Sequence, residues 1–338
     1  MTPYPAGLET TWLPVALSGQ LKTRPLSRRI AGQPIVLFRT ADGSVSALQD
    51  RCPHRNYPLS AGRVVEGTLQ CPYHGWRFDG SGACVALPGA GETPDLRRLG
   101  AARIDVAERH GAIFVRLAGD GSATEPDLPP LIGHPDYDHF WWTRPPWKGR
   151  ALDALENILD PFHTNFVHDG LIRVSSRRQP VRQTVTLAAK GFHVAYDQDA
   201  PDRGWMSRLL EGSRRRSTGQ YLPPVVFQGR WEKADRLSLC ATAFFVPETP
   251  DRYRPIGCWT TPKGLAPAWL KKQAILGFIR VVAEQDRRAL ERQHDTIQAF
   301  GGVRFKSGPT DRLTTPLTRL YNGETLEPGQ DGPHAIWL

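Results

Sequence analysis

Short apolar runs separated by turn residues dominate the first third of the chain. Runs of this length bounded by Gly, Asp and Pro are typical of β-strands. Residues 41–44, Ala-Asp-Gly-Ser, and 79–82, Asp-Gly-Ser-Gly, each predict a turn between two such runs. Strands are expected at residues 34–39, 45–48, 68–71, 76–78, 104–106 and 112–117. We therefore predict a small all-β domain over residues 1–120.

The pattern changes after residues 119–135, which are rich in Gly, Asp and Pro and predict a linker. Helical periodicity from residue 267 to 300 predicts one long helix. Residues 199–224 are polar and Arg-rich and predict a loop or flap, and residues 301–338 are expected to be mostly irregular. Strands are expected at residues 139–143, 181–187, 192–196, 225–231, 237–246 and 254–260. Residues 121–338 are therefore expected to form an α+β domain, a sheet backed by helices.

Composition adds limits on location and partners. The chain is 40% hydrophobic and 23% charged, as in ordinary soluble proteins. It has no run of about 18 apolar residues that could span a membrane and no signal-peptide pattern at its N-terminus, so we expect a cytoplasmic protein. The net charge is +9, but the basic residues are scattered and interleaved with acidic ones. This favours an acidic protein partner over nucleic acid.

Two of the five cysteines lie in a ligand-like pattern with histidines. The pairs are Cys52-x-His54 and Cys71-x-x-His74, with sixteen residues between them. A structural zinc site is one interpretation, but zinc fingers usually pair Cys with Cys and His with His. Mixed pairs on β-loops favour a Rieske [2Fe-2S] cluster, in which two cysteines bind one iron and two histidines the other. The remaining cysteines, Cys84, Cys240 and Cys258, lack partners at ligand spacing and are expected to be packing residues.

A second polar cluster interrupts the apolar residues 156–168. It contains His163 and His168, five residues apart, with Asp160 and Asn157 nearby. The two histidines can converge only if a helix tightens or ends here, and Pro161 supplies a reason because it lacks an N–H. Two histidines and one carboxylate with open positions suit a non-heme iron(II) that reacts with oxygen. Packing roles for the histidines are the alternative, but buried polar groups need partners.

The helix predicted from residue 267 offers a third ligand. Glu284 and Glu291 lie off its apolar stripe and within reach of arginines, so solvent-facing ion pairs are expected. Asp286, in contrast, interrupts the stripe and is expected to face the core. An unpaired carboxylate there is costly, which makes Asp286 the candidate iron ligand. The stripe is formed by Ile279, Val282, Asp286, Leu290 and Ile297.

These motifs resemble those of the bacterial Rieske non-heme iron oxygenases. Residues 50–55, Asp-Arg-Cys-Pro-His-Arg, and 71–79, Cys-Pro-Tyr-His-Gly-Trp-Arg-Phe-Asp, are similar to the Rieske motifs. The family's second pattern is Asn/Asp/Glu-x₂-Asp-x₂-His-x₄-His with a late Asp on a helix. It is matched here by Asn157, Asp160, His163, His168 and Asp286. The resemblance spans residues 10–300. It implies an all-β Rieske domain followed by an α+β helix-grip (START-like) catalytic domain.

The resemblance also implies roles for these residues. Cys52, His54, Cys71 and His74 would hold the [2Fe-2S] cluster, and His163, His168 and Asp286 would hold a mononuclear Fe(II). Asp160 would link His74 of one subunit to His163 of the next in a head-to-tail homotrimer, and Asn157 belongs to the same catalytic set.

The implied activity is that of an oxygenase component. It would take electrons from a separate NAD(P)H-dependent reductase or ferredoxin, and use O₂ to hydroxylate or oxidatively demethylate a hydrophobic or aromatic molecule. The absence of a Gly-x-Gly-x-x-Gly motif after a strand argues against NAD(P)H or flavin binding by the chain itself. A ring-dihydroxylating dioxygenase and a Rieske electron carrier without oxygenase activity are the alternatives. Candidate substrate-pocket walls are Phe162, Phe166, Phe227, Phe244, Phe245 and Trp259.

Overall fold

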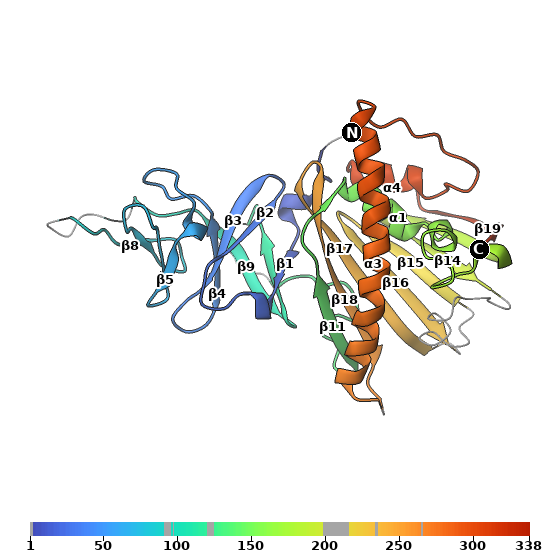
Figure 1. The fold of residues 1–338 in the computed structure, drawn as a ribbon, viewed down its shortest axis with the longest axis horizontal. Helices are drawn as coiled ribbons and strands as arrows, with labels where there is room; N and C mark the ends of the chain where they lie inside the picture. Colours follow the sequence, from blue (N-terminus) through green and yellow to red (C-terminus); the bar gives the residue numbers. More distant parts are fainter. Residues whose placement is uncertain are drawn as a thin grey trace. The chain divides into compact units, whose positions relative to one another are not determined.

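The computed structural model describes residues 3–90, 96, 98–119, 125–198, 216–233, 236–264 and 266–338. The chain divides into two compact units (Figure 1). One unit comprises residues 9–128, and the other comprises residues 129–338 together with residues 1–8. The domain boundary expected at residue 120 falls outside the described residues.

The first unit is built from two antiparallel sheets and contains no α-helix among its described residues. The larger sheet has the order β1-β10-β9-β4-β3-β2, and the smaller has the order β5-β6-β7-β8. The strands are β1 (Leu13–Leu17), β2 (Leu26–Ile30), β3 (Gln33–Arg39), β4 (Val45–Gln49), β5 (Arg63–Val65), β6 (Thr68–Gln70), β7 (Arg77–Phe78), β8 (Cys84–Ala86), β9 (Arg103–Arg109) and β10 (Ala112–Arg116). Short 3₁₀ turns lie at η1 (Leu8–Thr10), η2 (Ser18–Gln20) and η3 (Leu59–Ala61).

The strands that we expected in this unit are confirmed, whereas β1, β2 and the three-residue strands β5 and β8 were not predicted. Proline lies inside β1, and β2 carries two arginines among five residues, so neither has a clear strand pattern. A buried core that includes Phe38, Leu69 and Phe78 packs directly against Cys52 and Cys71. Apolar packing thus fixes the backbone from which the two cysteine loops project.

The second unit is organised around one antiparallel sheet with the order β11-β18-β17-β16-β15-β14-β13-β19, and β12 pairs with β18. The strands are β11 (Tyr137–Thr143), β12 (Trp147–Lys148), β13 (Pro180–Ala188), β14 (Gly191–Asp197), β15 (Arg216–Leu222), β16 (Val226–Lys233), β17 (Arg236–Thr249), β18 (Arg252–Pro262) and β19 (Gly329–Trp337). Two short 3₁₀ turns, η4 (Phe162–Asn165) and η5 (Ser175–Arg177), precede β13.

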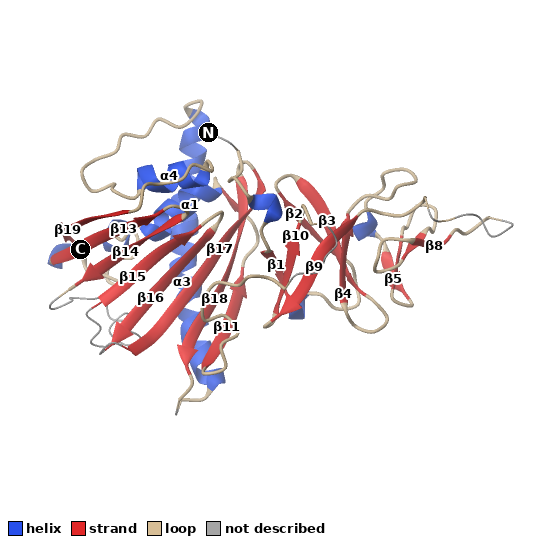
Figure 2. Cartoon of the chain, turned by 180° about the vertical axis from the view of Figure 1, so that it is seen from behind, coloured by secondary structure: helices blue, strands red, loops and turns tan. Residues whose placement is uncertain are grey.

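The helices of this unit lie on one face of the sheet (Figures 1 and 2). They are α1 (Ala151–Leu159), α3 (Ala268–Ala299) and α4 (Thr314–Tyr321). The long helix α3 crosses the strands and buries Ile275, Ile279 and Leu290 in the core that it shares with α1 and the sheet. This is the α+β helix-grip arrangement that we expected. No helix in the described part of the chain is long and apolar enough to cross a membrane.

Two regions expected to be irregular contain helices or strands that were not predicted. Residues 301–338 contain α4 and β19, and β19 pairs with β13 along its length. The sequence of β19, Gly-Gln-Asp-Gly-Pro-His-Ala-Ile-Trp, has little apolar alternation, so backbone pairing and not side-chain burial defines it. Within the region 199–224, residues 216–222 form β15. The Arg-rich stretch 203–215 lies outside the described residues.

Candidate active site

Two similar loops in the first unit carry the Cys/His pairs. In each loop the cysteine N–H donates to the carbonyl oxygen five residues ahead, at 2.8 Å for both Cys52 and Cys71. The N–H four residues ahead donates back to the cysteine carbonyl, at 2.9 and 3.1 Å. The residue that donates this bond has a positive φ, 58° at Asn56 and 75° at Gly75, which Asn and Gly adopt most easily. The two motifs therefore have equivalent backbones, although their Cys–His spacings differ.

The sulfur and imidazole groups of these loops gather in one place. Cys52 and Cys71 are buried, with 2% and 1% of their surfaces exposed. The rings of His54 and His74 lie 4.5 Å apart, and His54 stacks on Trp76 at 4.6 Å. Burial, together with the neighbouring Cys71, raises the pKa of the Cys52 thiol to about 11. Two buried sulfurs that interact with each other, on the same two loops as two adjacent imidazoles, form a donor set that suits a mixed-ligand iron–sulfur cluster.

The His54 ring fits this interpretation. Burial, followed by the charges of His74 and Arg55, lowers the pKa of His54, which favours the neutral imidazole that binds metals. Its Nδ1 atom is buried and has no hydrogen-bond partner among the described residues. His74 is exposed, so this imidazole is accessible from outside the unit.

The second site begins where α1 ends. Asp160 is extended (φ −81°, ψ 116°), as expected for a residue that precedes proline. The chain then turns through η4, which carries His163, and His168 follows in the next turn. The prediction that Pro161 disrupts the helix is confirmed, and the helix ends before both histidines. This break allows two imidazoles five residues apart to approach each other, with ring centroids 5.2 Å apart.

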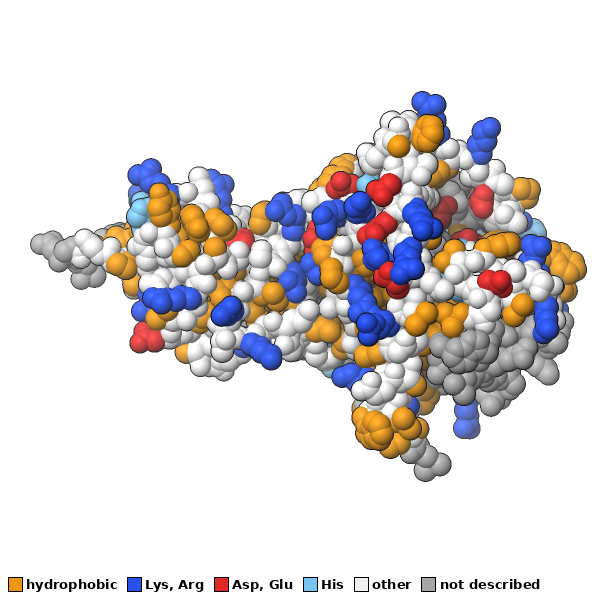
Figure 3. All heavy atoms as spheres, viewed as in Figure 1, with side chains coloured by type: hydrophobic (Ala, Val, Ile, Leu, Met, Phe, Trp, Pro, Cys, Tyr) orange, Lys and Arg blue, Asp and Glu red, His pale blue; other side chains and the backbone are white. Residues whose placement is uncertain are grey.

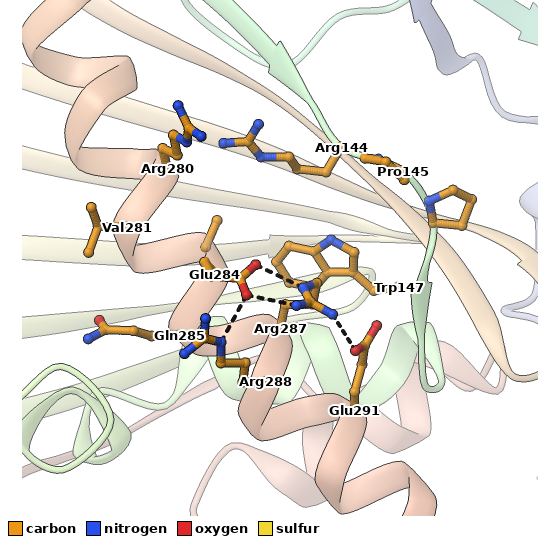
Figure 4. A pocket seen from close by; sticks show the side chains of 12 residues that line it. Arg144, Pro145, Trp147, Arg280, Val281, Glu284, Gln285, Arg287, Arg288 and Glu291 are labelled. Atoms are coloured by element: carbon orange, nitrogen blue, oxygen red, sulfur yellow. Dashed lines mark hydrogen bonds and ion pairs between the residues drawn. The ribbon is translucent and has the colours of Figure 1, made fainter.

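Helix α3 supplies the acidic side of the site. As predicted, Glu284 and Glu291 face outward in ion pairs with Arg287, at 2.7 and 2.5 Å. Figure 3 shows charged side chains gathered over α3, and Figure 4 shows Arg287 bridging the two glutamates. Asp286 lies on the inner face and lines the cavity that contains the two histidines.

His163, His168 and Asp286 converge on a single point. The Nε2 atoms of His163 and His168 lie 3.5 and 3.1 Å from Oδ1 of Asp286. Three ligand atoms, one from each residue, lie within 4.8 Å of one another, which is close enough for one metal ion to bind them all.

The opposite nitrogens of the two histidines fix their orientation. Nδ1 of His163 lies 2.6 Å from the backbone oxygen of Asp160, and Nδ1 of His168 lies 2.8 Å from Oε1 of Gln285. Both partners are acceptors, so each Nδ1 carries the hydrogen and each Nε2 presents a lone pair toward Asp286. Lone pairs that face a carboxylate require a cation between them, either a proton or a metal ion. Nε2 of His168 is buried without a well-oriented hydrogen bond, and the donor set fits a divalent metal.

The ionisation of the site follows from burial and proximity. Burial lowers the pKa of His163. Burial also acts to lower the pKa of His168, but Asp286 and Gln285 outweigh it and the net shift is upward. Burial alone would raise the pKa of Asp286, yet the two histidines and Asn157 lower it on balance. The carboxylate is thus held charged in a mostly buried position, ready to bind a cation.

Asn157 of α1 and Asp160, the residue that follows α1, support the site. The Asn157 amide donates to Oδ1 of Asp286 at 3.1 Å. Asp160 accepts from the N–H of Phe162 through Oδ1 at 2.8 Å, while its backbone oxygen binds His163. Burial raises the pKa of Asp160. Its carboxylate lines both the cavity over the histidines and a second, acidic pocket.

A cavity of about 220 Å³ opens onto the three converging residues. Its walls are mostly apolar, and Trp231 stacks on Trp259 at 5.8 Å. The buried Arg173 also lines the cavity and is its one Lys or Arg among the described residues. This volume and lining suit a small aromatic or hydrophobic molecule.

The structure separates the aromatic residues that we considered as pocket walls. Phe227 and Trp259 line the cavity. Phe245 lines a neighbouring apolar space, and Phe162 lines the acidic pocket. Phe166 is 64% exposed, and Phe244 is buried in the core. Alternation along a strand predicts which face a residue lies on, but not whether that face meets a cavity or a helix.

Gln285 and Tyr196 were not predicted from the sequence. Gln285 orients His168, yet nothing distinguishes it in the sequence except its position beside Asp286. The Tyr196 hydroxyl donates to the backbone oxygen of Leu159 at 3.3 Å, where α1 ends, and also lines the cavity. Both contacts join segments that are distant in sequence, and therefore no local pattern reports them.

Two family descriptions match the chain. Residues 11–98 match the family "Rieske [2Fe-2S] domain". Residues 147–316 match "Vanillate O-demethylase oxygenase C-terminal domain". The first match contains the four Cys and His residues of the paired loops, and the second contains the three converging residues.

Curated relatives include oxygenase components. Dicamba O-demethylase from Stenotrophomonas maltophilia is 42% identical over 166 residues, 48% of this chain and 48% of that protein. The 4β-methylsterol monooxygenase of Methylococcus capsulatus is 40% identical over 213 residues, 60% of this chain and 56% of that protein. The chain spans about half of the length of these relatives.

Solved structures share the fold along most of the chain. Dicamba monooxygenase bound to dicamba has a TM-score of 0.78 at 22% identity, and covers 92% of this chain and 96% of its own. NdmA of Pseudomonas putida CBB5 with caffeine has a TM-score of 0.76 at 20% identity, and covers 97% and 98%. The architecture of both units is thus that of known oxygenases.

Proposed function

Since this chain belongs to the Rieske non-heme iron oxygenase family, we propose that it is an oxygenase component that uses O₂ and external electrons to oxidise a small hydrophobic or aromatic molecule. A [2Fe-2S] cluster and a mononuclear iron are the cofactors of this family. The observation that supports the proposal best is the convergence of His163, His168 and Asp286 at the base of a mostly apolar cavity.

We assign the two cofactors to the two sites. Cys52, His54, Cys71 and His74 hold the [2Fe-2S] cluster, and His163, His168 and Asp286 hold Fe(II). When bound, the cluster supplies single electrons and the mononuclear iron activates O₂. The chain's own residues orient these groups: Gln285 and the Asp160 backbone oxygen set the tautomers of the two histidines, and Asn157 holds the carboxylate of Asp286.

Asp160 has a second proposed role, between the two metal sites. Its backbone oxygen orients His163. Its carboxylate oxygen Oδ1 accepts a hydrogen bond from the N–H of Phe162, and the other carboxylate oxygen, Oδ2, does not take part in this bond. We propose that this carboxylate accepts a hydrogen bond from His74 of a second copy of the chain and so links the two sites across subunits. Ligand histidines commonly depend on such outer partners for orientation.

The proposed reaction is hydroxylation at a C–H bond. On an O-methyl or N-methyl substrate, one oxygen atom of O₂ enters the C–H bond, and the other leaves as water after two electrons and two protons are taken up. The hydroxymethyl product then breaks its bond to the heteroatom and releases formaldehyde. The match of residues 147–316 to a family named for an O-demethylase favours this outcome. The name of another relative, 3-chlorobenzoate-3,4-dioxygenase from Comamonas testosteroni, keeps ring dihydroxylation as the alternative.

Metal analysis tests the site assignment. Anaerobically purified protein should contain about three irons per chain, two in the cluster and one mononuclear. His163→Ala should lose one of the three and keep the Rieske visible and EPR spectra. Two irons in the wild type would indicate an electron carrier, and zinc in a colourless protein would indicate a structural site.

Substrate screening tests the activity. O₂ uptake with a generic reductase should increase in the presence of certain hydrophobic or aromatic methyl ethers or methylamines, and formaldehyde should form in step with it. If no compound stimulates uptake although three irons are present, the proposed substrate class is wrong.

A further inference from the structure

A second, smaller cavity lies beside the candidate iron site. Its volume is about 90 Å³, and its lining comes from α1, α3 and the sheet. Four alanines surround it: Ala154 of α1, Ala241 and Ala243 of β17, and Ala283 of α3. The rigid rings of Phe245 and other aromatic residues complete the wall. Small side chains on three separate elements leave this space unfilled, and we call it the side chamber.

The side chamber shares a wall with the main cavity. Among the described residues, six line both: Ile158, Ala241, Trp259, Ile279, Val282 and Asp286. Asp286 is one of them, so the side chamber reaches the carboxylate on which the two histidines converge. Ile279 and Val282 of α3 also line both spaces, so their side chains form part of the wall between the side chamber and the main cavity.

Two of the polar side chains that line the side chamber are engaged in hydrogen bonds. Oγ1 of Thr242 accepts a hydrogen bond from Gln228 at 3.1 Å, and the amide of Asn157 donates to Asp286 at 3.1 Å. A buried water needs two to four polar partners, and without them an apolar cavity stays dry and takes up apolar guests. The side chamber is therefore expected to exclude water and to favour small apolar molecules.

We propose that the side chamber binds molecular oxygen and supplies it to the iron site from the Asp286 side. The inference rests on the proposed oxygenase function, since only that reaction gives O₂ a use here. The main cavity would then hold the organic substrate while O₂ waits in a separate space. Both reactants could thus be present without competing for the same volume.

Xenon is the probe for the chamber itself, because it is apolar, of similar size to O₂ and visible by anomalous scattering. Crystals of the wild-type protein pressurised with xenon should show a xenon atom among Ala154, Ala243 and Phe245. An ordered water there, or xenon in other cavities but not in this one, would refute the proposal. This measurement requires no substrate and no activity.

Filling the side chamber tests its role. In Ala243→Ile the larger side chain should displace the xenon and slow the association of nitric oxide, an O₂ analogue, with the reduced protein several-fold, while iron content stays unchanged. Ala195→Ile is the matched control: Ala195 is buried in β14 of the same sheet and lines neither cavity. Ala154→Leu fills the same space from α1 and replaces Ala243→Ile if that variant does not fold.

The possible outcomes distinguish the failure of the oxygen-supply proposal from the failure of the proposed oxygenase function. Displaced xenon with an unchanged nitric oxide rate would show that the side chamber is not on the gas route. Weaker binding of the organic substrate in the filled variants, with an unchanged nitric oxide rate, would make the side chamber part of the substrate pocket. Wild-type protein without mononuclear iron would refute the proposed function, whereas the xenon result would stand.

Discussion

One oxygen atom, Oδ1 of Asp286, is the point on which the candidate site depends. It faces the Nε2 atoms of His163 and His168 and accepts a hydrogen bond from Asn157. A carboxylate in this mostly buried position is stable only with such partners. The three side chains that surround it all come from residues 157–168, and each of the two histidines is held by a further hydrogen bond of its own. The positions of the proposed ligand atoms therefore depend on residues that are not ligands themselves, namely Asn157, Asp160 and Gln285.

Gln285 offers the clearest test of that dependence. Its Oε1 accepts from Nδ1 of His168 at 2.8 Å. Gln285→Leu should weaken metal binding by roughly 10–100-fold, because outer partners of this kind typically contribute that much. Gln285→Glu keeps an acceptor and should restore most of the affinity. Co²⁺ titration followed by visible spectroscopy measures both, and Gln298→Leu, at an exposed position on the same helix, is the control. Equal affinities in all three would show that Gln285 does not orient His168.

Asp160 is expected to affect electron delivery and not metal content. Asp160→Asn removes the charge but keeps the backbone oxygen that orients His163. The variant should retain about three irons and lose nearly all substrate-coupled turnover. Asp311→Asn changes another carboxylate that lines the adjacent acidic pocket and should leave turnover close to that of the wild type. Iron analysis together with product formation distinguishes the two, and normal turnover in Asp160→Asn would contradict the bridging role.

At the scale of elements, close packing between strands and helices decides where small residues are required. A Cβ on Gly257 of β18 would lie 2.2 Å from Nε1 of Trp142 on the paired strand β11. A Cβ on Gly277, on an exposed turn of α3, would have no described atom within 4 Å apart from the backbone of its own helix. Glycine is therefore required for steric reasons at position 257 but not at position 277.

These two glycines predict opposite effects of one substitution. Gly257→Ala should destabilise the protein by about 1–3 kcal/mol, as overpacking does. Gly277→Ala should stabilise it by roughly 0.5–1 kcal/mol, because alanine is a better helix former. Urea unfolding of both variants beside the wild type measures the difference. If both substitutions changed the free energy of unfolding in the same direction, the Trp142 side chain would have to move away from the added Cβ at little cost.

Strands of the first unit are also joined by charge. Arg39 of β3 donates to both carboxylate oxygens of Glu108 on β9, each at 3.0 Å. The hydrogen bond from Arg39 lowers the pKa of Glu108 despite its partial burial. A lowered folded-state pKa means that the pair stabilises the fold above the unfolded-state pKa of about 4.3, and that this contribution is lost as the pH falls through the folded-state pKa.

Glu108→Gln should therefore make stability less sensitive to acid. The variant is expected to be less stable than the wild type at pH 7 by less than about 1 kcal/mol, because the pair is partly solvated. The difference should shrink toward pH 3. Thermal unfolding between pH 7 and 3 measures it, and a difference that does not change with pH would contradict the assignment.

The sequence predicted elements well where burial is periodic. The long helix α3 and the strands β16, β17 and β18 follow apolar patterns, and Asp286 was distinguished from Glu284 by helical counting alone. Elements whose residues are mostly exposed, such as β2 and β19, left no such pattern. Gln285 and the side chamber arise from contacts between distant segments, which single-sequence periodicity does not encode.

At the scale of the whole molecule, the two candidate metal sites belong to different units. The cysteine loops lie in residues 9–128, and the His/Asp site lies in residues 129–338. His74 is exposed and Asp160 lines two cavities, so both are open to a partner. We propose a homotrimer in which electrons cross between chains, and a separate reductase or ferredoxin as the donor.

Trimers that contain two different variants test whether electrons pass between chains. His74→Ala disables the cluster of its chain, and His163→Ala disables the iron site of its chain, so neither variant alone should turn over. When the two are co-expressed in equal amounts, electron transfer between chains should restore about a quarter of wild-type activity, since one neighbouring pair in four joins an intact donor to an intact acceptor. Light scattering should show three chains per particle. No restored activity would place the transfer within one chain.

The position of Asp286 on α3 has a consequence for how this sequence can change over time. Of the four consecutive residues 284–287, the first and last form an outward ion pair and the middle two contact the site, because each step along an α-helix rotates the side chain by about 100°. Point substitutions on the outer face leave that order intact. Insertion or deletion of one residue between Ile275 and Asp286 would instead turn a different side chain toward the histidines. Indels are therefore expected to be absent from this segment of α3 among functional descendants, and to accumulate in residues 301–312, outside any helix or strand.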